Sequence, residues 1–175
     1  AGGTVVNFNP LYSQEELELQ TRDSGTMIMV TLDLAVTFDK VAMQPGMPQG
    51  FGTVGEEATP IFTLLGNPVS AFVSFEVFVR PAIRKMLGVS RLHRPSVKAV
   101  LQTTLRSPEG KRQFARARWS PAPDGSYLVT PLAGQASHLL ADLAYANALV
   151  VVPELVTEVA AGQVVDTVLL ERRKG

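Results

Sequence analysis

The chain has 175 residues, of which 46% are hydrophobic and 18% charged, so it is long enough to bury a core as one domain or as two small ones. Its 16 basic and 16 acidic residues cancel, which removes any general electrostatic attraction to nucleic acid or to an anionic membrane. The absence of cysteine excludes disulfides, zinc–thiolate sites and thiol nucleophiles and fits the cytoplasm, and no apolar run reaches the ~20 residues of a membrane span.

A strand–helix–strand unit is predicted at the start of the chain. Residues 4–8 form a short β-type run, and Ser13 then caps the first turn of a helix that Gly25 ends. The unbroken apolar run at residues 27–32 is typical of a strand covered on both faces. Two strands and a helix within about 30 residues make a βαβ unit.

The middle of the chain is predicted to hold a loop, a strand and a long helix. Residues 41–55, rich in Gly and Pro, indicate a long ordered or functional loop without a core element, and residues 60–65 a buried strand. A helix should begin after Asn67 and end on Gly88. Its apolar residues spread around most of its circumference, so we expect it to be largely buried, with a kink from Pro81 near Val77.

After Arg91 the hydrophobic period changes to two, which is typical of half-buried strands. The pattern predicts a strand over residues 97–105, a hairpin from residues 113–119 and 127–130, a short helix over 137–146, and strands over 149–152 and 164–170. These elements form a small β-domain. We therefore place a domain boundary between Gly88 and Ser96, which divides the chain into residues 1–90 and 91–175.

Three stretches of the sequence resemble the MoeA/gephyrin family of molybdopterin molybdenumtransferases, and they occur in the family's order. They are VAMQPGMPQGFG at residues 41–52, FTLLGNPVS at 62–70, and GQASHL at 134–139 with LAYAN at 143–147. The resemblance covers roughly residues 41–170. It implies a mixed α/β chain, with part of a three-layer α/β molybdopterin-binding domain followed by a small β-barrel-like domain.

The resemblance also implies a role in molybdenum cofactor biosynthesis. The family hydrolyses adenylylated molybdopterin and inserts molybdate into its dithiolene, and it requires Mg²⁺. It is dimeric, with sites completed across subunits, so we expect a homodimer that takes a small-molecule pterin as its partner. The family's Ser-Gly-Gly-rich motif and the acidic residues expected to hold Mg²⁺ lie upstream of the matching region, in a part that this sequence lacks.

Residues 1–40 resemble a different family, the AMP-forming long-chain acyl-CoA synthetases. The similar stretches are VVNFNPLY at residues 5–12, ELE at 16–18 and DSG at 23–25. The two resemblances meet around residues 38–41, which indicates a chimera made by engineering or by recombination. Because the segment has no Ser/Thr/Gly-rich phosphate loop, we expect no acyl-adenylate chemistry from it.

The first candidate binding site is the turn that opens the long helix. Gly66, Asn67 and Pro68 precede free backbone N–H groups, which together with the helix dipole can hold a phosphate or another oxyanion. Ser70 adds a hydroxyl in the first turn. The alternative interpretation is a helix start that is only well capped.

The second candidate site is the loop that contains Pro45, Gly46 and Pro48. The prolines fix the shape of the backbone and the glycine permits close approach of a ligand. A plain connecting loop is an equally open interpretation. Met47 stands where the family has a lysine in Pro-Gly-Lys-Pro, so we assign it no catalytic role.

Arg116 and Ser137 are the candidate catalytic residues. Arginine suits phosphate and molybdate because its fork donates two parallel hydrogen bonds, and Arg116 stands where the family has an arginine after its Gly-Arg-x-x-Phe run. A solvated strand face shared with Arg118 is the alternative. Ser137 is a candidate oxyanion contact or a plain helix cap. With only His93 and His138 in the chain, no metal site is expected.

Three functions stay open at this point. The chain is an active molybdenumtransferase, a module that only binds a pterin, an oxyanion or a protein, or an inactive chimera that retains the fold. The missing acidic residues argue against turnover by this chain alone.

Overall fold

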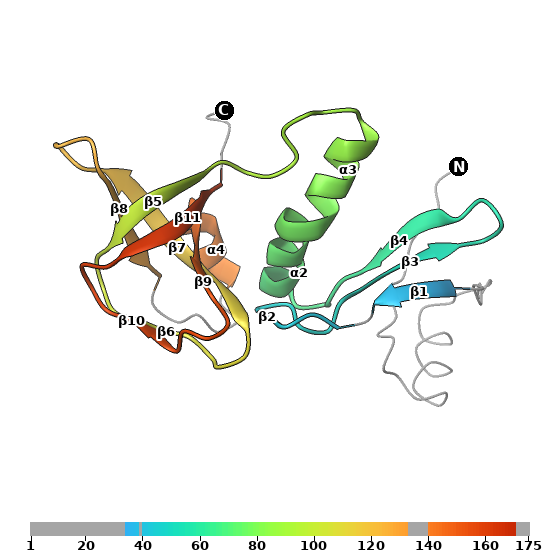
Figure 1. Ribbon diagram of the computed structural model, residues 1–175, viewed down its shortest axis with the longest axis horizontal. Helices are drawn as coiled ribbons and strands as arrows, with labels where there is room; N and C mark the ends of the chain where they lie inside the picture. The colour runs from blue at the N-terminus through green and yellow to red at the C-terminus, as the bar shows by residue number, and fades with distance from the viewer. Residues whose placement is uncertain (1–33, 39, 133–139, 171–175) are drawn as a thin grey trace.

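The computed structural model describes residues 34–38, 40–132 and 140–170. The predicted strand–helix–strand unit, Ser137 and His138 lie outside the described residues. Within the described part, a small sheet, a long helix and a β-barrel lie in a row, with the helix in the middle (Figure 1).

The small sheet is antiparallel, with the order β1 (Leu34–Phe38), β3 (Gly50–Val54) and β4 (Thr59–Thr63). The prediction that residues 41–55 form only a loop is therefore wrong for β3. Its ring at Phe51 packs on Phe62 of β4, with centroids 4.8 Å apart, and on Phe38 of β1, at 6.2 Å. These cross-strand contacts stabilise a strand whose own glycine-rich composition favours a loop. The expected strand at residues 60–65 is present as β4, although it is half-buried or exposed rather than buried.

One continuous helix follows, made of α2 (Pro68–Ser74), the π-helical turn η1 (Phe75–Val79) and α3 (Arg80–Met86). It ends as predicted at Gly88, which has a φ of +70°. There the Val89 N–H donates to the Arg84 carbonyl at 2.9 Å, the bond expected when a left-handed residue terminates a helix. The irregularity expected near Val77 is the π turn, which precedes the missing N–H of Pro81.

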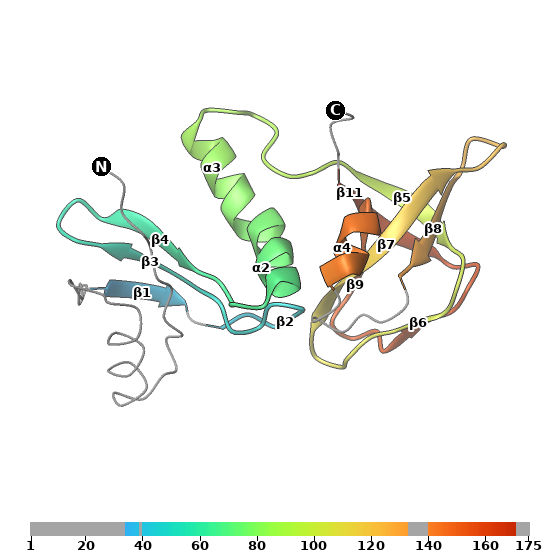
Figure 2. The ribbon, with the colours of Figure 1, turned by 180° about the vertical axis from the view of Figure 1, so that it is seen from behind.

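The helix is less buried than its apolar circumference predicted. Val69 and Val73 are fully buried, but Ile83 is 44% exposed and Met86 and Leu87 are each 73% exposed. The first half lies against the barrel, whereas no described element covers the outer side of α3 (Figure 2). None of the described helices is long and apolar enough to cross a membrane.

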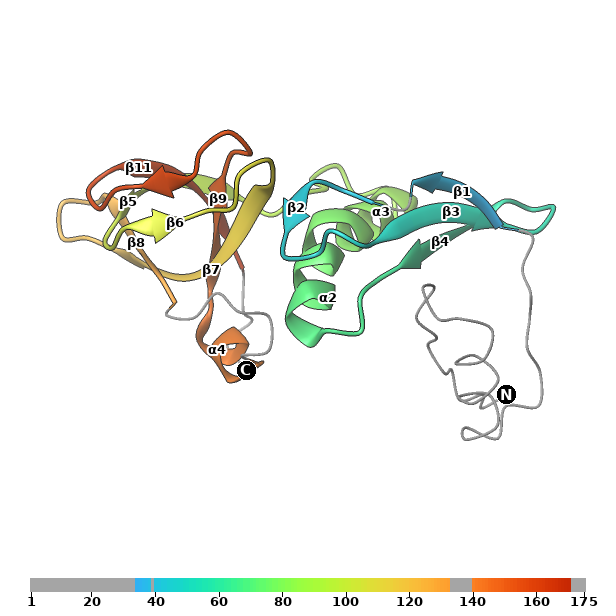
Figure 3. The ribbon, with the colours of Figure 1, turned by 90° about the horizontal axis from the view of Figure 1, so that it is seen from below.

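The C-terminal half is a closed five-stranded barrel, which confirms the predicted β-barrel-like fold (Figure 3). Its strands are β7 (Arg112–Pro121), β8 (Tyr127–Pro131), β5 (Ser96–Leu101), β11 (Val164–Leu169) and β9 (Ala148–Val152), and β9 pairs back onto β7 to close the ring. Small and β-branched side chains fill the interior; they include Ala99, Ala115, Ala117, Val129, Val150 and Val152.

The remaining elements are short. The strand predicted over residues 97–105 is broken after Leu101 and resumes as β6 (Leu105–Arg106), which pairs with β10 (Glu158–Val159). The helix α4 (Leu140–Tyr145) precedes β9 and contacts α2. Strand β2 (Met43–Gln44) pairs in parallel with the start of β7, so the loop after it is carried to the barrel edge.

A second core cluster joins the helix to the outer face of the barrel. Met43 of β2, Val73 of α2 and Leu149 of β9 are buried in it together with Leu170. Phe114 of β7 packs against the same cluster. The helix and the barrel are therefore connected by a shared apolar core as well as by the chain.

Candidate functional site

The loop after β2 lies directly against helix α2. Pro45 and Gly46 are buried, whereas Pro48 is exposed. The Gln44–Pro45 peptide is cis, and Gly46 has a φ of +109°. A Cβ added to Gly46 would lie 2.6 Å from the Ser74 hydroxyl oxygen, so a larger residue between the loop and α2 would require Ser74 to shift. The close approach predicted for Gly46 is therefore occupied by helix α2 of the same chain and not by a ligand.

The opening turn of α2 is capped from within the chain. The Asn67 side-chain oxygen accepts from the Val69 and Ser70 N–H groups at 3.1 and 3.2 Å. The Ala71 N–H donates to the Asn67 carbonyl, and Pro68 has no N–H. The expectation of free N–H groups at this turn is wrong, because the amide side chain satisfies the donors that an oxyanion would need. Gly66 is exposed beside it, and Ser70 is buried.

Arg116 is almost completely buried, with 1% of its surface exposed. It points to the outer face of the barrel, because its neighbours Ala115 and Ala117 fill the interior. It pairs in register with Leu149, which packs with Met43 and Val73. The solvated-face interpretation is therefore wrong for Arg116, while Arg118, two residues further along the same face, is exposed and fits it.

The three resembling stretches meet at one junction. The loop with Gly46 lies on α2, β2 pairs with the strand that carries Arg116, and α4 of the third stretch contacts α2. Of the predicted residues, Pro45, Gly46, Ser70 and Arg116 are buried in these elements. Pro48, Gly66 and Pro68 are exposed, and Ser137 lies outside the described residues.

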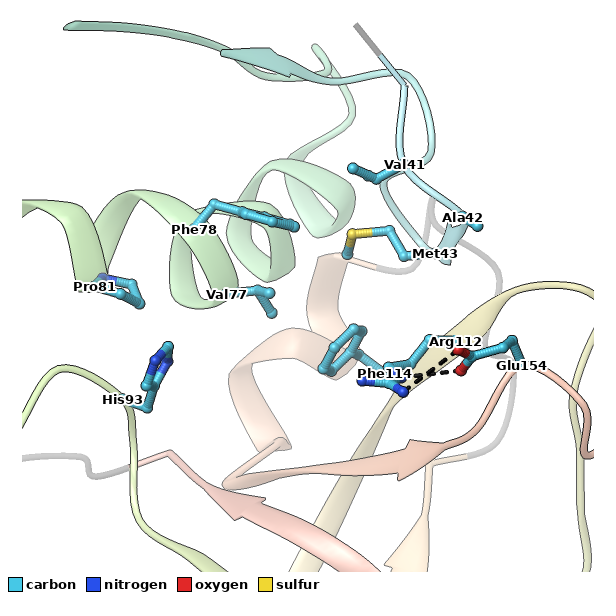
Figure 4. A pocket seen from close by; sticks show the side chains of 10 residues that line it. All are labelled: Val41, Ala42, Met43, Val77, Phe78, Pro81, His93, Arg112, Phe114 and Glu154. Atoms are coloured by element: carbon cyan, nitrogen blue, oxygen red, sulfur yellow. Dashed lines mark hydrogen bonds and ion pairs between the residues drawn. The ribbon is translucent and has the colours of Figure 1, made fainter. Parts of the chain in front are cut away.

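A separate open cleft of about 630 Å³ lies between the helix and the barrel, shown in Figure 4. Its apolar wall includes Val77, Phe78 and Phe114. At its barrel side, Arg112 donates to the Glu154 carboxylate at 3.1 Å, and the pKa of Glu154 lies below its ordinary value because its own backbone N–H and then Arg112 donate to it.

None of the predicted site residues that the structure describes lines this cleft. Sequence reasoning missed it because the wall comes from the loop, the helix, the linker and the barrel, and no local pattern joins those segments. Most of its wall is apolar, and the polar side chains that line it are Arg112 and Glu154 of the ion pair and His93 of the segment between the helix and the barrel.

The potential metal ligands of residues 34–38, 40–132 and 140–170 do not cluster. No group of three His, Cys, Asp or Glu side chains comes together there. Mg²⁺ is commonly bound by one or two carboxylates together with substrate phosphates and water, so a magnesium site completed by a substrate needs no such group.

Two family models match the chain. The one described as "MoeA C-terminal region (domain IV)" matches residues 98–170, which is the barrel. The one described as "Probable molybdopterin binding domain" matches residues 26–85, which includes β1, β3, β4 and the helix. This second match begins upstream of the junction expected near residues 38–41.

Individual proteins to which the chain is similar carry related names. The chain is 54% identical over 130 residues to "Molybdopterin molybdenumtransferase 2" of Mycobacterium tuberculosis, covering 74% of this chain and 31% of that protein. It is 44% identical over 135 residues to "Molybdopterin molybdenumtransferase 1" of the same organism, covering 75% and 32%. A crystal structure of the molybdopterin biosynthesis MoeA protein from Pyrococcus horikoshii OT3 superimposes with a TM-score of 0.63 at 29% identity, over 77% of this chain and 32% of that one. The chain thus spans about a third of the length of these relatives.

Proposed function

Because the chain belongs to the MoeA family of molybdenum cofactor biosynthesis, we propose that it binds molybdopterin where the loop at residues 45–48, helix α2 and strand β7 meet. The observation that carries this proposal is the burial of Arg116 at that junction, on the outer face of the barrel. Arg118, two residues further along the same strand, is exposed. Arg116 already has an interaction within the chain, but a guanidinium carries five N–H donors and its planar fork suits phosphate, so it can serve both.

The other site residues take supporting roles in this proposal. Ser70 and Ser137 contribute hydroxyls to the pterin phosphate, and Pro45, Gly46 and Pro48 fix the loop that borders it. Asn67 and Pro68 hold the start of α2 and, with Gly66, shape the turn rather than supply N–H donors.

For this chain, binding is the function that its residues support best. Insertion of molybdate into adenylylated molybdopterin is the larger reaction to which that binding belongs, and it needs Mg²⁺, for which the described residues offer no acidic cluster. An inactive chimera that retains the fold is the alternative.

Four further expectations accompany the proposal. We propose that the chain forms a homodimer, that the segment between Gly88 and Ser96 is its domain boundary, and that it acts in the cytoplasm. The junction expected near residues 38–41 is wrong, because the molybdopterin-binding match begins at residue 26; fusion of a foreign segment upstream of that residue stays a prediction.

The test is titration of the purified chain with molybdopterin and with its adenylylated form, followed by fluorescence. We expect saturable binding that Arg116→Ala and Ser137→Ala weaken by more than tenfold, since charge-assisted hydrogen bonds contribute roughly 1.5–3 kcal/mol each. Arg118→Ala is the matched control, because Arg118 lies on the same strand but is exposed. Arg116→Lys keeps the charge and loses the fork, so it should bind with intermediate affinity.

Absence of binding by a chain that is folded by circular dichroism would overturn the proposal and favour the inactive alternative. Binding that Arg118→Ala weakens as much as Arg116→Ala would place the pterin elsewhere. A transfer assay with molybdate and Mg²⁺ then separates an active transferase from a binding module.

A further inference from the structure

A buried carboxylate on the long helix holds the segment that connects the helix to the barrel. Glu76 lies in the π turn and is 8% exposed. Arg94, at the far end of the connecting segment, donates to both of its oxygens, from Nε at 2.8 Å and from Nη2 at 3.0 Å. Such a fork-to-carboxylate pair fixes orientation as well as distance.

Two arginines of the helix also contact the connecting segment. Arg80 lies 3.8 Å from the Glu76 carboxylate and donates to the Leu92 carbonyl at 3.1 Å. Arg84 donates to the Arg91 carbonyl at 2.6 Å. Three points of residues 91–94 are therefore held against the helix.

The connecting segment is fixed at its barrel end as well. The Leu169 N–H of β11 donates to the Pro95 carbonyl at 2.9 Å, and β5 begins at the next residue. A rotation of the barrel about the helix would pull on residues 91–95 and would have to break the contacts to Glu76, Arg80 or Arg84.

Because the Glu76–Arg94 ion pair is buried, it favours one orientation of the connecting segment on the helix. The Glu76 and Arg94 side chains expose only 7% and 16% of their surface, in contrast to the Lys98–Asp166 pair on the barrel, at 69% and 56%. Exposed pairs contribute little and tolerate many geometries. A desolvated pair strongly disfavours the arrangements in which either charge is left alone, so it selects one orientation more than it adds stability.

We propose that Glu76, Arg94 and Arg80 are positioning residues that lock the barrel in one orientation on the helix. This inference rests in part on the proposed function, because that orientation brings the Arg116 strand to the loop and α2. The lock itself concerns only the described contacts and is measurable without ligand.

The experiment measures the helix–barrel distance in the full chain. The sequence has no cysteine, so Met86→Cys at the exposed end of α3 and Glu109→Cys in an exposed barrel turn accept spin labels selectively. Pulsed electron–electron double resonance should give one narrow distribution of the distance between the two labels in the chain that is otherwise unchanged. Adding Glu76→Gln, which keeps the shape and removes the charge, should broaden it and shift its maximum.

Two variants make the result specific. Asp166→Asn breaks the exposed Lys98–Asp166 pair and should leave the distribution unchanged. Arg94→Lys keeps the charge without the fork and should broaden the distribution less than Glu76→Gln does. It also replaces Glu76→Gln in the test if that variant does not fold.

A narrow, unshifted distribution in a folded Glu76→Gln or Arg94→Lys chain would overturn the lock, since a merely stabilising pair would not widen the distances of the folded state. Broadening with weakened pterin binding supports the lock and its link to the site. Failure of the parent chain to bind molybdopterin would overturn the proposed function while the distances still decide the lock.

Discussion

The side-chain amide of Asn147 pairs with both main-chain groups of Trp119. Its oxygen accepts from the Trp119 N–H at 2.8 Å, and its nitrogen donates to the Trp119 carbonyl at 3.2 Å. The Asn147 N–H meanwhile donates to the Ala117 carbonyl, one step before β9 begins. A side chain thus continues the ladder between β7 and β9 at the position where the chain turns away to α4.

We therefore predict that Asn147→Ala destabilises the chain by about 1–3 kcal/mol, because it leaves two half-buried main-chain groups of Trp119 without partners. The free energy of unfolding in urea measures the effect. Gln102→Ala removes an exposed side-chain bond to the Val100 carbonyl and is the control, with little expected change. Equal losses in both variants would mean that the Asn147 amide is no special part of the barrel.

Gly46→Ala should be more disruptive than other glycine substitutions. Its φ of +109° disfavours any side chain, and the new Cβ would lie 2.6 Å from the Ser74 hydroxyl and 3.2 Å from Met43 Cε. Gly110 also has a positive φ but nothing within 4 Å, so Gly110→Ala should cost only the backbone strain, about 1 kcal/mol. Overpacking adds roughly 1–3 kcal/mol to that strain at Gly46.

Thermal unfolding of the two glycine variants checks this prediction. We expect the Gly46→Ala transition at clearly lower temperature than that of Gly110→Ala. Adding Ser74→Ala to Gly46→Ala removes the closest contact, the Ser74 hydroxyl, without placing a glycine in the helix, and should restore part of the difference. No restoration would mean that the backbone conformation, and not the packing on α2, accounts for the loss.

The features that sequence predicted well are those encoded locally. Asn67 and Gly88 mark the ends of the long helix because capping depends on a few adjacent residues. The barrel strands followed from alternation, since each has one face inside and one outside. The position of the helical irregularity followed from Pro81.

The features that sequence missed depend on distant partners. Strand β3 exists because Phe51 pairs with Phe62 and Phe38, which its own glycines do not indicate. Arg116 is buried while Arg118 on the same strand face is exposed, a difference that the alternation of the strand does not indicate. The N–H groups that were expected to be free at the start of α2 have a local partner, because the N-cap Asn67 accepts from Val69 and Ser70.

Asn67→Ala should destabilise the chain by about 1 kcal/mol, since the bonds to the Val69 and Ser70 N–H groups are lost. Asn67→Ser retains an acceptor at the N-cap and should be nearly neutral. Gly66→Ala, at a neighbouring position with nothing within 4 Å, is a control for the exposed turn. Urea unfolding decides the outcome, and equal stability of the Ala and Ser variants would contradict the capping role.

The ion pair of Arg112 and Glu154 beside the open cleft should make the stability of the chain depend on pH. The pKa of Glu154 is lowered from its ordinary 4.5, first by its own backbone N–H and then by Arg112. Because the folded-state pKa is depressed, the pair contributes stability above the ordinary value, and that contribution is lost as the pH falls through the lower folded value.

An NMR titration of the Glu154 carboxyl carbon should therefore show a midpoint below 4.5. Arg112→Gln removes the second cause and leaves the first, so the midpoint should rise only part of the way to 4.5. A full return to 4.5 would make the arginine the dominant cause, and an unchanged midpoint would mean that the ion pair at 3.1 Å does not persist in solution. Both side chains are about half exposed, so added salt should screen the Arg112 contribution and leave the backbone contribution in place.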